Sequence, residues 1–471
     1  MNSGARTEML AGRAGVDGVR GLLYGRSTRT RLRPGLASLL TEGATLARLR
    51  LERAKLKPGR KLTGYYLVDV RLLDGVPVSR AVEVTWSADG APDQVQPAET
   101  AMEEEARIRG VAVPFEALRW EAPDLGARVR IAPLDVAYPQ LVRLCDPEHV
   151  RVLLAAAYGE AGHDEVVAPT YDVTAVRYRP RQRHVLRYDP VGTRGAGPVF
   201  AKVYTAGSAA PALRIATAIA DRVEGQPVPV AAARPLGGSA ADDVVLFSRL
   251  AGVPLTRRLW TDSAATGRHL RTAGALLRRL QADPGALRSD LSTRDFPRET
   301  RAVARAAEHL APLDTSLGSQ VERLLDGALA LNATIAAEEP CFAHGDYKSD
   351  HLWIARDRLT LLDFDTCCLA EPALDVGKFL ADLSWWHMIG GRSDVAEAQQ
   401  CFLAGYGAMS RERLARARLY EVLILTKIII RRLRRFELDW APRTAGCLEQ
   451  AEHLLAVAAG HDKSPRGAFA R

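Results

Sequence analysis

The chain has 471 residues, of which 47% are hydrophobic and 25% are charged, a composition typical of folded globular proteins and not of disordered chains. This length allows two or three domains, each with a core of its own. The net charge of +8 suits small anionic ligands. Because no basic run is interleaved with spaced aromatic residues, and no zinc-finger or helix-turn-helix pattern occurs, nothing favours a nucleic acid as partner.

The cysteines and the apolar segments indicate a cytoplasmic protein. The six cysteines form no C-x-x-C pair and show no zinc spacing, which fits a reducing compartment. The N-terminal residues carry scattered charges and lack the apolar core of a secretory signal. The most apolar run, 419–430, contains Glu421 and Lys427 and is too short to span a bilayer. We therefore expect a soluble cytoplasmic chain without membrane contact, and its oligomeric state is not indicated.

Residues 1–165 are expected to form an N-terminal module of helices and strands. The segment Thr41 to Leu56 is interpreted as a helix. Alternating segments on either side of the turn residues Leu73 to Pro77 predict a hairpin. Asp146 and Pro147 have the residue types of an N-cap and a first helical residue. The strands expected here are 65–72, 81–86 and 127–131, and the helix runs from 147 to 158.

From about residue 166 the pattern changes to strands, so we expect a small antiparallel lobe over 166–252. Its expected elements are strands at 171–178, 184–188 and 199–204, a helix at 208–223, and strands at 228–234 and 244–250 joined through Gly237, Gly238 and Ser239. The third strand carries Lys202 between apolar neighbours, which would fix the ammonium group at the end of a packed strand. An outward-facing strand lysine is the alternative interpretation.

The remaining residues, 253–471, are expected to form a mostly helical lobe. Its Leu and Ala residues recur at helical spacing. The expected helices are 264–281, 301–310, 321–337, 373–388, 395–406, 411–436 and 445–459.

The most informative stretch of the chain lies inside this helical region. The sequence HGDYKSDH begins at His344, and two apolar runs, 352–354 and 359–362, follow it and predict a hairpin that leads to Asp363. Phosphoryl transfer from ATP needs one carboxylate to orient the attacking hydroxyl and a second to hold the Mg²⁺ that bridges the phosphates. Asp346 and Asp363 suit these two roles. Turn-forming aspartates would explain each residue singly but not their joint spacing.

This pattern resembles the aminoglycoside and choline phosphotransferase family, a branch of the protein-kinase-like fold. That family carries His-Gly-Asp, four variable residues and an Asn, followed by Ile/Leu-Asp-Phe/Trp. The resemblance covers roughly 166–459 and is strongest over 342–382. It implies an α+β, bilobed fold, with an antiparallel-sheet lobe at 166–252 and an α-rich lobe with the catalytic loop at 253–471, preceded by the additional module at 1–165.

The resemblance also implies site residues and the cofactors ATP and Mg²⁺. Asp346 matches the catalytic aspartate, and Lys348 lies where a related lysine contacts the transferring phosphoryl group. Asp363 matches the Mg²⁺ ligand. Asp375, in the segment EPALDV, matches a buried aspartate that braces the catalytic loop, and His344 is expected to be structural as well.

Other residues are expected to bind the nucleotide. Lys202 lies where the fold places the lysine that pairs with the α- and β-phosphates, although no acidic partner for it can be assigned. The turn that should cover the phosphates lacks glycines and carries Arg179, Arg181 and Arg183, whose guanidinium groups can bind phosphate oxygens. A solvated basic turn is the alternative. The adenine is expected to bond to backbone groups from Ser248 to Leu250.

His351 departs from the family pattern, because it stands where the family has its metal-binding Asn. Mg²⁺ prefers oxygen ligands, so an imidazole is a poor replacement. Either Asp350 or Asp365 supplies the missing oxygen, or the site manages with fewer protein ligands, or it is impaired. The metal candidates are therefore Asp363, His351 and Asp365. His351 as a loop-packing histidine is an equally open interpretation.

The acceptor cannot be identified from the sequence. Trp385 and Trp386 lie on a helix where the family's acceptor pocket is expected, and one ring could stack on a substrate. A cationic acceptor would need an acidic floor, for which Glu371, Asp382 and Asp394 are candidates. The basic cluster that begins at Arg431 is interpreted first as a solvated helix end and second as a docking surface.

The sequence thus predicts an ATP-dependent phosphotransferase that acts on a hydroxyl group of a small molecule, of aminoglycoside, sugar or amino-alcohol type. The alternative is a catalytically impaired, kinase-like nucleotide-binding or regulatory module, which the histidine at 351 and the missing glycine loop support. A protein kinase is disfavoured, because no Ala-Pro-Glu element or long activation segment follows Asp363.

Overall fold

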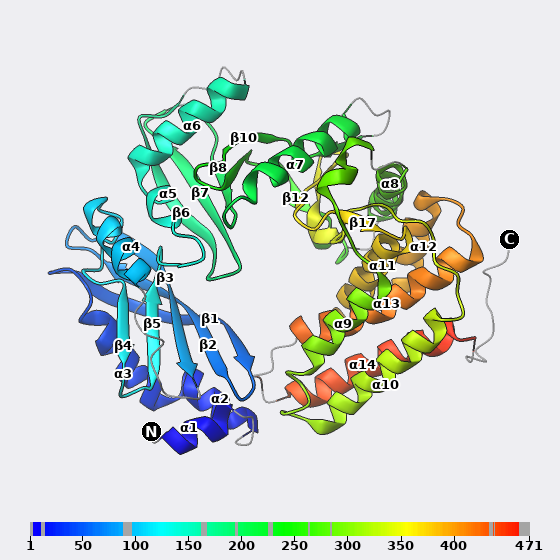
Figure 1. Cartoon of the computed structure of the whole chain (residues 1–471), viewed down its shortest axis with the longest axis horizontal. Coiled ribbons are helices and arrows are strands. Elements are labelled where there is room, and N and C mark those ends of the chain that lie inside the picture. The colour runs from blue at the N-terminus through cyan, green and yellow to red at the C-terminus, as the bar shows by residue number, and fades with distance from the viewer. Residues whose placement is uncertain are drawn as a thin grey trace. The chain divides into compact units, whose positions relative to one another are not determined.

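The computed structural model divides into two compact units, one of residues 1–214 and 234–249 and the other of residues 215–233 and 250–471 (Figure 1). The described residues are 3–10, 15–87, 97–161, 167–193, 196–224, 229–261, 264–282, 285–432, 437 and 439–460. The mixed helix-and-sheet class expected from the sequence is confirmed. The expected division into lobes after residues 165 and 252 stays a prediction.

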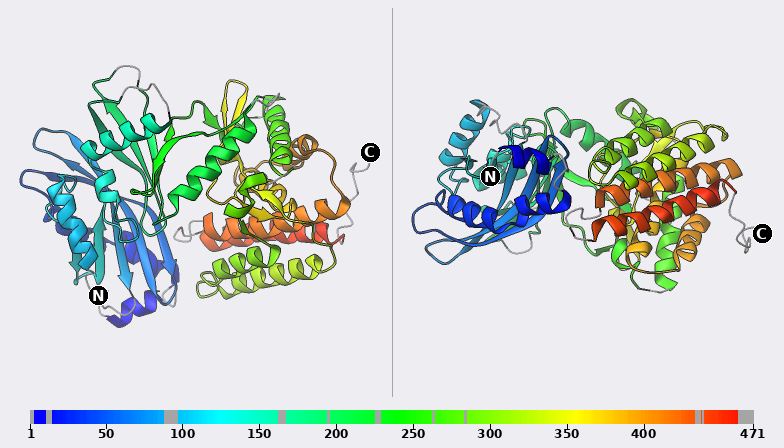
Figure 2. Two further views of the ribbon diagram at one scale, coloured as in Figure 1. Left: turned by 45° about the horizontal axis from the view of Figure 1, so that its top comes forward. Right: turned by 90° about the horizontal axis from the view of Figure 1, so that it is seen from below.

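A five-stranded sheet of order β1-β2-β3-β5-β4 forms the first half of the first unit. Its antiparallel strands are β1 (Thr45–Lys57), β2 (Lys61–Arg71), β3 (Pro77–Ser87), β4 (Arg119–Ala122) and β5 (Ala127–Ile131). Val68, Val84 and Val129 are buried in its core because alternate residues of each strand face inward. Tyr66 donates from its hydroxyl to the carbonyl oxygen of Leu23 in α2, one of the blue helices across this sheet (Figure 2). The helices here are α1 (Ser3–Leu10), α2 (Gly15–Tyr24), α3 (Arg26–Ala37) and α4 (Pro97–Ile108).

A second five-stranded sheet, of order β10-β11-β8-β7-β6, completes this unit. Its strands are β6 (Thr170–Arg179), β7 (Arg183–Val191), β8 (Val199–Val203), β10 (Pro235–Ser239) and β11 (Val244–Ser248). Two helices, α5 (Leu141–Leu144) and α6 (Pro147–Ala161), pack on it, and Leu154 shares one buried core with Tyr188 and Leu246. The Asp146 carboxylate accepts from the Glu148 backbone N–H at 3.0 Å at the start of α6, as expected of an N-cap.

The second unit holds two small sheets within a set of helices. One sheet has the order β12-β15-β16-β9 and the other β13-β17-β14. The hairpin predicted between the two aspartates is confirmed, because β15 (Leu352–Ala355) pairs antiparallel with β16 (Arg358–Leu361). The other strands are β9 (Val230–Ala232), β12 (Val253–Pro254), β13 (Ser292–Thr293), β14 (Cys341–Ala343) and β17 (Cys368–Ala370).

The helices expected after residue 205 are confirmed, with shifts at their ends. They are α7 (Ala209–Val223), α8 (Ala264–Leu280), α9 (Phe296–Ala307), α10 (Thr315–Asn332), α11 (Ala373–Ile389), α12 (Val395–Tyr406), α13 (Arg411–Arg432) and α14 (Trp440–Ala458), with short 3-10 helices η1 (Leu255–Arg257), η2 (Gly285–Asp290) and η3 (Ser349–His351). The last four residues of the expected helix 411–436, residues 433–436, lie outside the described residues. No helix in the described ranges is both long and apolar enough to cross a membrane.

Two expectations for the first unit are wrong. The segment interpreted as a helix, 41–56, is mostly the edge strand β1, which pairs with β2 from Thr45 to Lys57. Pairing with a neighbouring strand overrides the helix preference of its Leu, Ala and Arg residues. Gly237 and Gly238 do not link two strands but lie inside β10. A Cβ atom at Gly237 would lie 3.1 Å from that of Ala157, so the glycine permits close packing against α6.

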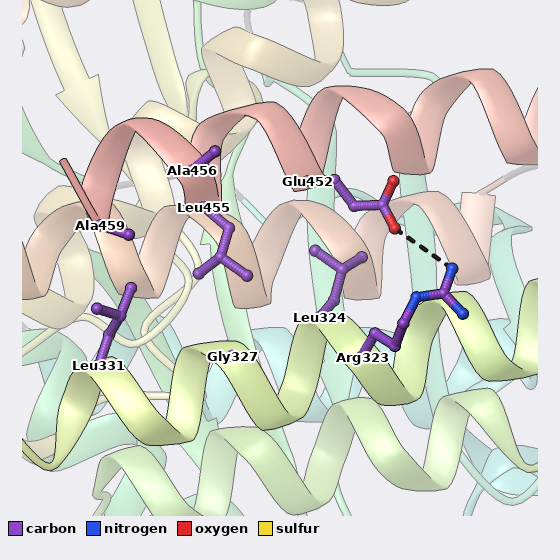
Figure 3. A pocket seen from close by; sticks show the side chains of 8 residues that line it. All are labelled: Arg323, Leu324, Gly327, Leu331, Glu452, Leu455, Ala456 and Ala459. Carbon is purple, nitrogen blue, oxygen red and sulfur yellow. Dashed lines mark ion pairs between the residues drawn. The ribbon is translucent and has the colours of Figure 1, made fainter. Parts of the chain in front are cut away.

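A surface pocket of about 370 Å³ lies between α10 and α14, which run side by side (Figure 3). Leu324, Leu331 and Leu455 give it an apolar wall, and Arg323 faces Glu452 across it at 3.8 Å.

A buried ion pair joins Glu371, two residues before α11, to Arg416 in α13. Arg416 is 3% exposed and binds Glu371 through Nε and one terminal nitrogen, while Tyr420 donates to the same carboxylate at 3.3 Å. Removing one partner would leave the other charge buried without compensation.

We expect Arg416→Met to lower the free energy of unfolding by roughly 3 kcal/mol, because breaking a buried ion pair has a cost of this order. Urea unfolding followed by far-ultraviolet circular dichroism measures the change. The double variant Glu371→Gln with Arg416→Met is the control and should recover part of the loss. An unchanged unfolding midpoint in the single variant would contradict the proposed role of this pair.

Candidate active site

The loop between β14 and η3 is fixed by the carboxylate of Asp375, near the start of α11. This carboxylate accepts from the backbone N–H of His344 at 2.6 Å and from that of Gly345 at 2.9 Å. Asp375 is fully buried, and burial raises its pKa. Gly345 has a φ of +74°, and a Cβ atom there would lie 2.1 Å from the carbonyl oxygen of Thr366. Only glycine fits this position, because it is both left-handed and crowded.

The buried ring of His344 ties the loop to the end of β16. Its Nδ1 lies 3.3 Å from the backbone N–H of Asp346 and accepts from it, so Nε2 carries the proton in the neutral ring. Nε2 can then donate to the carbonyl oxygen of Leu362 at 3.2 Å. This histidine therefore positions Asp346 relative to the residue that precedes Asp363.

The side chain of Asp346 lies between two ammonium groups. Lys348 Nζ is 2.6 Å from Oδ2, and Lys378 Nζ, on α11, is 2.9 Å from Oδ1. Burial alone would raise the pKa of Asp346, but Lys378 and Lys348 outweigh it and hold this pKa well below its usual value. The side chain is still 25% exposed. Asp346 is thus a partly exposed hydrogen-bond acceptor whose ionised form is stabilised by two lysines.

His351 lies between the two aspartates of the motif. Its Nδ1 is 3.0 Å from the backbone oxygen of Asp346, and its Nε2 is 3.3 Å from Oδ2 of Asp363. Burial, followed by the charge of Lys348, lowers the pKa of His351 to about 3. Asp363 has a φ of +68°, a left-handed conformation that aspartate tolerates better than most residues. Asp365, two residues further, is exposed.

A second carboxylate of α11, about two helical turns after Asp375, also supports the loop. Oδ2 of the fully buried Asp382 accepts from the backbone N–H of Ser349 at 2.9 Å and from its hydroxyl at 2.5 Å. Thr256, in η1, lies 2.9 Å from the Ser349 hydroxyl and donates to Asp350 at 2.6 Å. Asp350 is therefore hydrogen-bonded to η1 through Thr256.

The sequence analysis missed Lys378 and the bracing role of Asp382. Both follow from Asp375 by helical spacing, since positions 375, 378 and 382 lie on one face of an α-helix. Once Asp375 is assigned to the loop, this spacing predicts that Lys378 and Asp382 also face it.

The first unit carries the nucleotide-binding candidates Lys202, Arg181, Arg183 and Ser248, and each is described within that unit. Lys202 lies on β8 between Val185 and Val245 of the neighbouring strands, with Nζ 5.9 Å from the Tyr204 ring centre. Ser248 is the last residue of β11. Leu250, the remaining candidate for the adenine contact, belongs to the second unit.

The arginine turn between β6 and β7 is held by a buried acid. The Asp135 carboxylate accepts from the backbone N–H of Arg181 at 2.6 Å and lies 2.8 Å from Nε2 of His184. Burial and the neighbouring cations, first Arg177, lower the pKa of Arg179 to about 10. The backbone of this turn is thus fixed while its guanidinium groups crowd together. This agrees with an anion-binding turn and equally with a solvated one.

The acidic residues considered for an acceptor floor already have partners. Glu371 is paired with Arg416, Asp382 with Ser349, and Asp394 with Arg392 through two contacts. Glu371 and Asp394 therefore have cationic partners, whereas Asp382 bonds only to a neutral serine, and its Oδ1 has no hydrogen-bond partner in the described part of the chain.

The indole faces at the end of α11 are also engaged. The Arg432 guanidinium carbon lies 5.8 Å from the ring centre of Trp385 and 5.2 Å from that of Trp386, and Trp260 meets Trp386 edge-on at 5.9 Å. The same guanidinium is 3.8 Å from Asp350. Of the basic cluster, residues 433–435 lie outside the described ranges.

The donors present fit a divalent cation held by few protein ligands. Within the described part of the chain, no three His, Cys, Asp or Glu side chains are grouped closely enough to hold a metal ion. His351 and Asp363 are adjacent as a pair, one nitrogen and one oxygen donor. A cation bound to nucleotide commonly has one or two protein ligands and completes its shell with phosphate oxygens and water.

Comparison with known proteins identifies the family. Residues 189–420 match the model of the phosphotransferase enzyme family, a range that contains Lys202, the loop 344–351 and α11. Residues 189–420, just under half of the chain, are therefore assigned to this phosphotransferase family. The protein-kinase-like fold expected for it is confirmed. No curated protein shows a significant sequence match to the chain.

Solved structures of phosphotransferases are similar at low identity. A spectinomycin phosphotransferase with ADP and spectinomycin is 13% identical, with a TM-score of 0.43 over 67% of this chain and 98% of that one. A choline/ethanolamine kinase family protein from Mesorhizobium loti is 17% identical, with a TM-score of 0.42 over 68% and 95%. An amicoumacin kinase with AMP-PNP and Ca²⁺ is 14% identical, with a TM-score of 0.45 over 60% and 88%. These likenesses carry no argument about the acceptor of this phosphotransferase.

We expect Lys378→Met to raise the pKa of Asp346, because one of the two ammonium groups that stabilise the ionised carboxylate is lost. Asp346 would then take up its proton at a higher pH. A carbon-13 NMR titration of aspartate carboxyl groups measures the shift. Lys378→Arg, which keeps the charge, is the matched control. An equal pKa in both variants would contradict the electrostatic role of Lys378.

Proposed function

We propose that this phosphotransferase uses ATP to phosphorylate a hydroxyl group of a small molecule. The observation that carries the proposal is the position of the Asp346 carboxylate, held between Lys348 and Lys378 on a loop whose backbone is bonded to Asp375. A carboxylate fixed in this way can orient a hydroxyl group without being protonated itself.

The strongly lowered pKa of Asp346 suits orientation better than proton abstraction. Each carboxylate oxygen has room for a second hydrogen bond beside the one to its lysine, so a hydroxyl can still donate to it. Because the transition state of phosphoryl transfer is loose, the attacking oxygen needs correct placement more than a strong base. Asp346 would hold the acceptor in line for attack. As the acceptor oxygen bonds to the γ-phosphorus and the bond to ADP breaks, the proton of the acceptor hydroxyl would pass to an oxygen of the transferred phosphoryl group.

The lysines and the metal-binding pair supply positive charge near the reacting oxygens. Lys348 would turn toward the phosphoryl oxygens while Lys378 keeps Asp346 ionised. Asp363 and His351 would hold the divalent cation, which when bound neutralises charge on the phosphates. Lys202, on β8, would be the partner of the α- and β-phosphates.

The acceptor is neutral or anionic. Glu371, Asp382 and Asp394, the acids that could have formed a cation-binding floor, are engaged with Arg416, Ser349 and Arg392. In addition, the groups around Asp346 and Asp350 are lysines and an arginine. A polycationic acceptor would meet like charges there, which disfavours binding.

The second candidate function is a nucleotide-binding module without turnover. His351, in the position of an oxygen ligand, favours it, because an imidazole is a weaker ligand for Mg²⁺. Acceptor-dependent ADP formation distinguishes the enzyme from the binding module.

We expect Asp346→Asn to reduce acceptor-dependent ADP formation by about a thousandfold, because the amide cannot orient the hydroxyl as an ionised carboxylate does. Binding of a fluorescent ADP analogue should change little. Asp357→Asn, an exposed residue in the turn between β15 and β16, is the control and should keep full activity. Nucleotide binding without turnover across a broad hydroxyl panel would favour the module instead.

Sugars and hydroxy acids should be better acceptors than an aminoglycoside or choline, because the charges beside Asp346 repel cations. Steady-state ADP formation with a panel of acceptors, each tested over a range of concentrations, measures the preference. A higher kcat/KM for the aminoglycoside than for the neutral sugars would contradict this assignment of the acceptor.

A further inference from the structure

The peptide group between Gly345 and Asp346 is held at both of its ends. Its N–H, which belongs to Asp346, donates to Nδ1 of His344 at 3.3 Å. Its carbonyl oxygen, which belongs to Gly345, accepts from Nη1 of Arg294 at 3.0 Å. Glycine permits backbone conformations that are closed to other residues, so Gly345 itself resists rotation of this peptide only weakly. The two hydrogen bonds therefore determine its orientation, and with it the φ angle of Asp346.

Arg294 reaches this carbonyl group from a fixed position beside the loop. It follows β13, and its backbone N–H donates to the carbonyl oxygen of Leu369 at 2.8 Å, which extends the pairing of β13 with β17. The next residue, Asp295, caps α9 by accepting from the Arg298 N–H at 2.8 Å. A Cβ atom at Gly345 would lie 2.9 Å from Nη1 of Arg294, so the glycine makes room for the guanidinium group.

A buried carboxylate holds this guanidinium group in turn. Nε of Arg294 lies 2.6 Å from Oε1 of Glu299, in α9, and Nζ of Lys427, in α13, lies 2.9 Å from Oε2 of the same carboxylate. The three side chains are between 3% and 16% exposed. Burial would raise the pKa of Glu299, but Arg294 and Lys427 outweigh it and lower this pKa to about 2. Two cations thus share one anion, and positive charge remains on Arg294 for the carbonyl oxygen of Gly345.

We infer that Arg294 is a positioning residue for Asp346, and that it acts by fixing the peptide group between Gly345 and Asp346 through the carbonyl oxygen of Gly345. The inference rests on the proposed function, since it assigns to Arg294 the placing of the carboxylate that orients the acceptor hydroxyl. Asp375 fixes the N–H groups of His344 and Gly345, and Arg294 fixes the carbonyl group that follows them. The two residues hold different peptide groups, so neither replaces the other.

A guanidinium group suits this role because it donates from several nitrogens in a fixed planar fork. Nε binds Glu299 while Nη1 binds the carbonyl oxygen of Gly345. A lysine would carry the same charge on a single nitrogen at the end of a flexible chain. It would pair with Glu299 and leave the carbonyl group without its donor. Arg294→Lys therefore keeps the charge and removes the positioning.

The test is amide hydrogen exchange of the full-length chain, followed residue by residue by NMR in the native chain, Arg294→Lys and Arg294→Ala. In both variants the exchange rate of the Asp346 N–H should rise roughly tenfold or more, because the peptide group is free to rotate. The N–H groups of His344 and Gly345, which donate to Asp375, should keep their native rates. Arg301→Ala, at an exposed arginine of α9, is the matched control and should change none of the three.

Turnover gives a second readout, measured as ADP formed with the neutral sugar that the native chain phosphorylates fastest. In Arg294→Ala we expect kcat to fall about a hundredfold while KM for ATP stays within about twofold, because a misplaced reacting group slows the chemical step. Guanidinium chloride, at a concentration that does not unfold the chain, should restore part of kcat in Arg294→Ala and none in Asp346→Asn.

An unchanged exchange rate of the Asp346 N–H in Arg294→Lys would overturn the inference. Equal increases at His344, Gly345 and Asp346 would also overturn it, because Arg294 would then only stabilise the loop as a whole. Arg294→Lys keeps a cation beside Glu299, so the exchange measurement remains decisive if Arg294→Ala fails to fold. A local increase at Asp346 in a chain that phosphorylates no acceptor would defeat the proposed function and leave the role of Arg294 in placing Asp346 standing. Full turnover in Arg294→Ala would do the reverse.

Discussion

The site depends on the buried carboxylate of Asp375, which accepts the backbone hydrogen bonds that a strand or helix partner would otherwise accept. Between β14 and η3 the backbone has no strand or helix partner for the N–H groups of His344 and Gly345, and both donate to Asp375 instead. Buried donors without an acceptor are costly, so this contact determines the path of the loop. Every other property of the site, including the direction in which Asp346 points, follows from that path.

The helix α11 acts as the common frame of the site. Asp375, Lys378 and Asp382 are three and four residues apart, and they contact the start of the loop, the side chain of Asp346 and Ser349 in turn. A rise of about 1.5 Å per residue spreads these contacts over roughly 10 Å along the helix. A single rigid element thus sets both the geometry and the charge of Asp346.

The sequence alone predicts structure and function well where chemically specific residues occur at a characteristic spacing. The motif from His344 to Asp363 led to the hairpin, the family and the candidate aspartates, because few other arrangements combine those residue types in that order. It was insufficient where a partner distant in sequence decides the outcome. The segment 41–56 has the composition of a helix, yet β2 pairs with it as a strand from Thr45 onward. Lys378 appears as an ordinary helical lysine until the loop is placed against it.

The backbone conformation of Asp363 determines which substitutions would inactivate the proposed site. Its left-handed backbone suits aspartate, asparagine and glycine, and it strains most other residues. A change to glutamate would keep the negative charge and disturb the turn, whereas a change to asparagine would remove the charge and keep the turn. A single change to asparagine would therefore give an inactive homologue with an unchanged fold. Its structure would be hard to distinguish from that of an active enzyme.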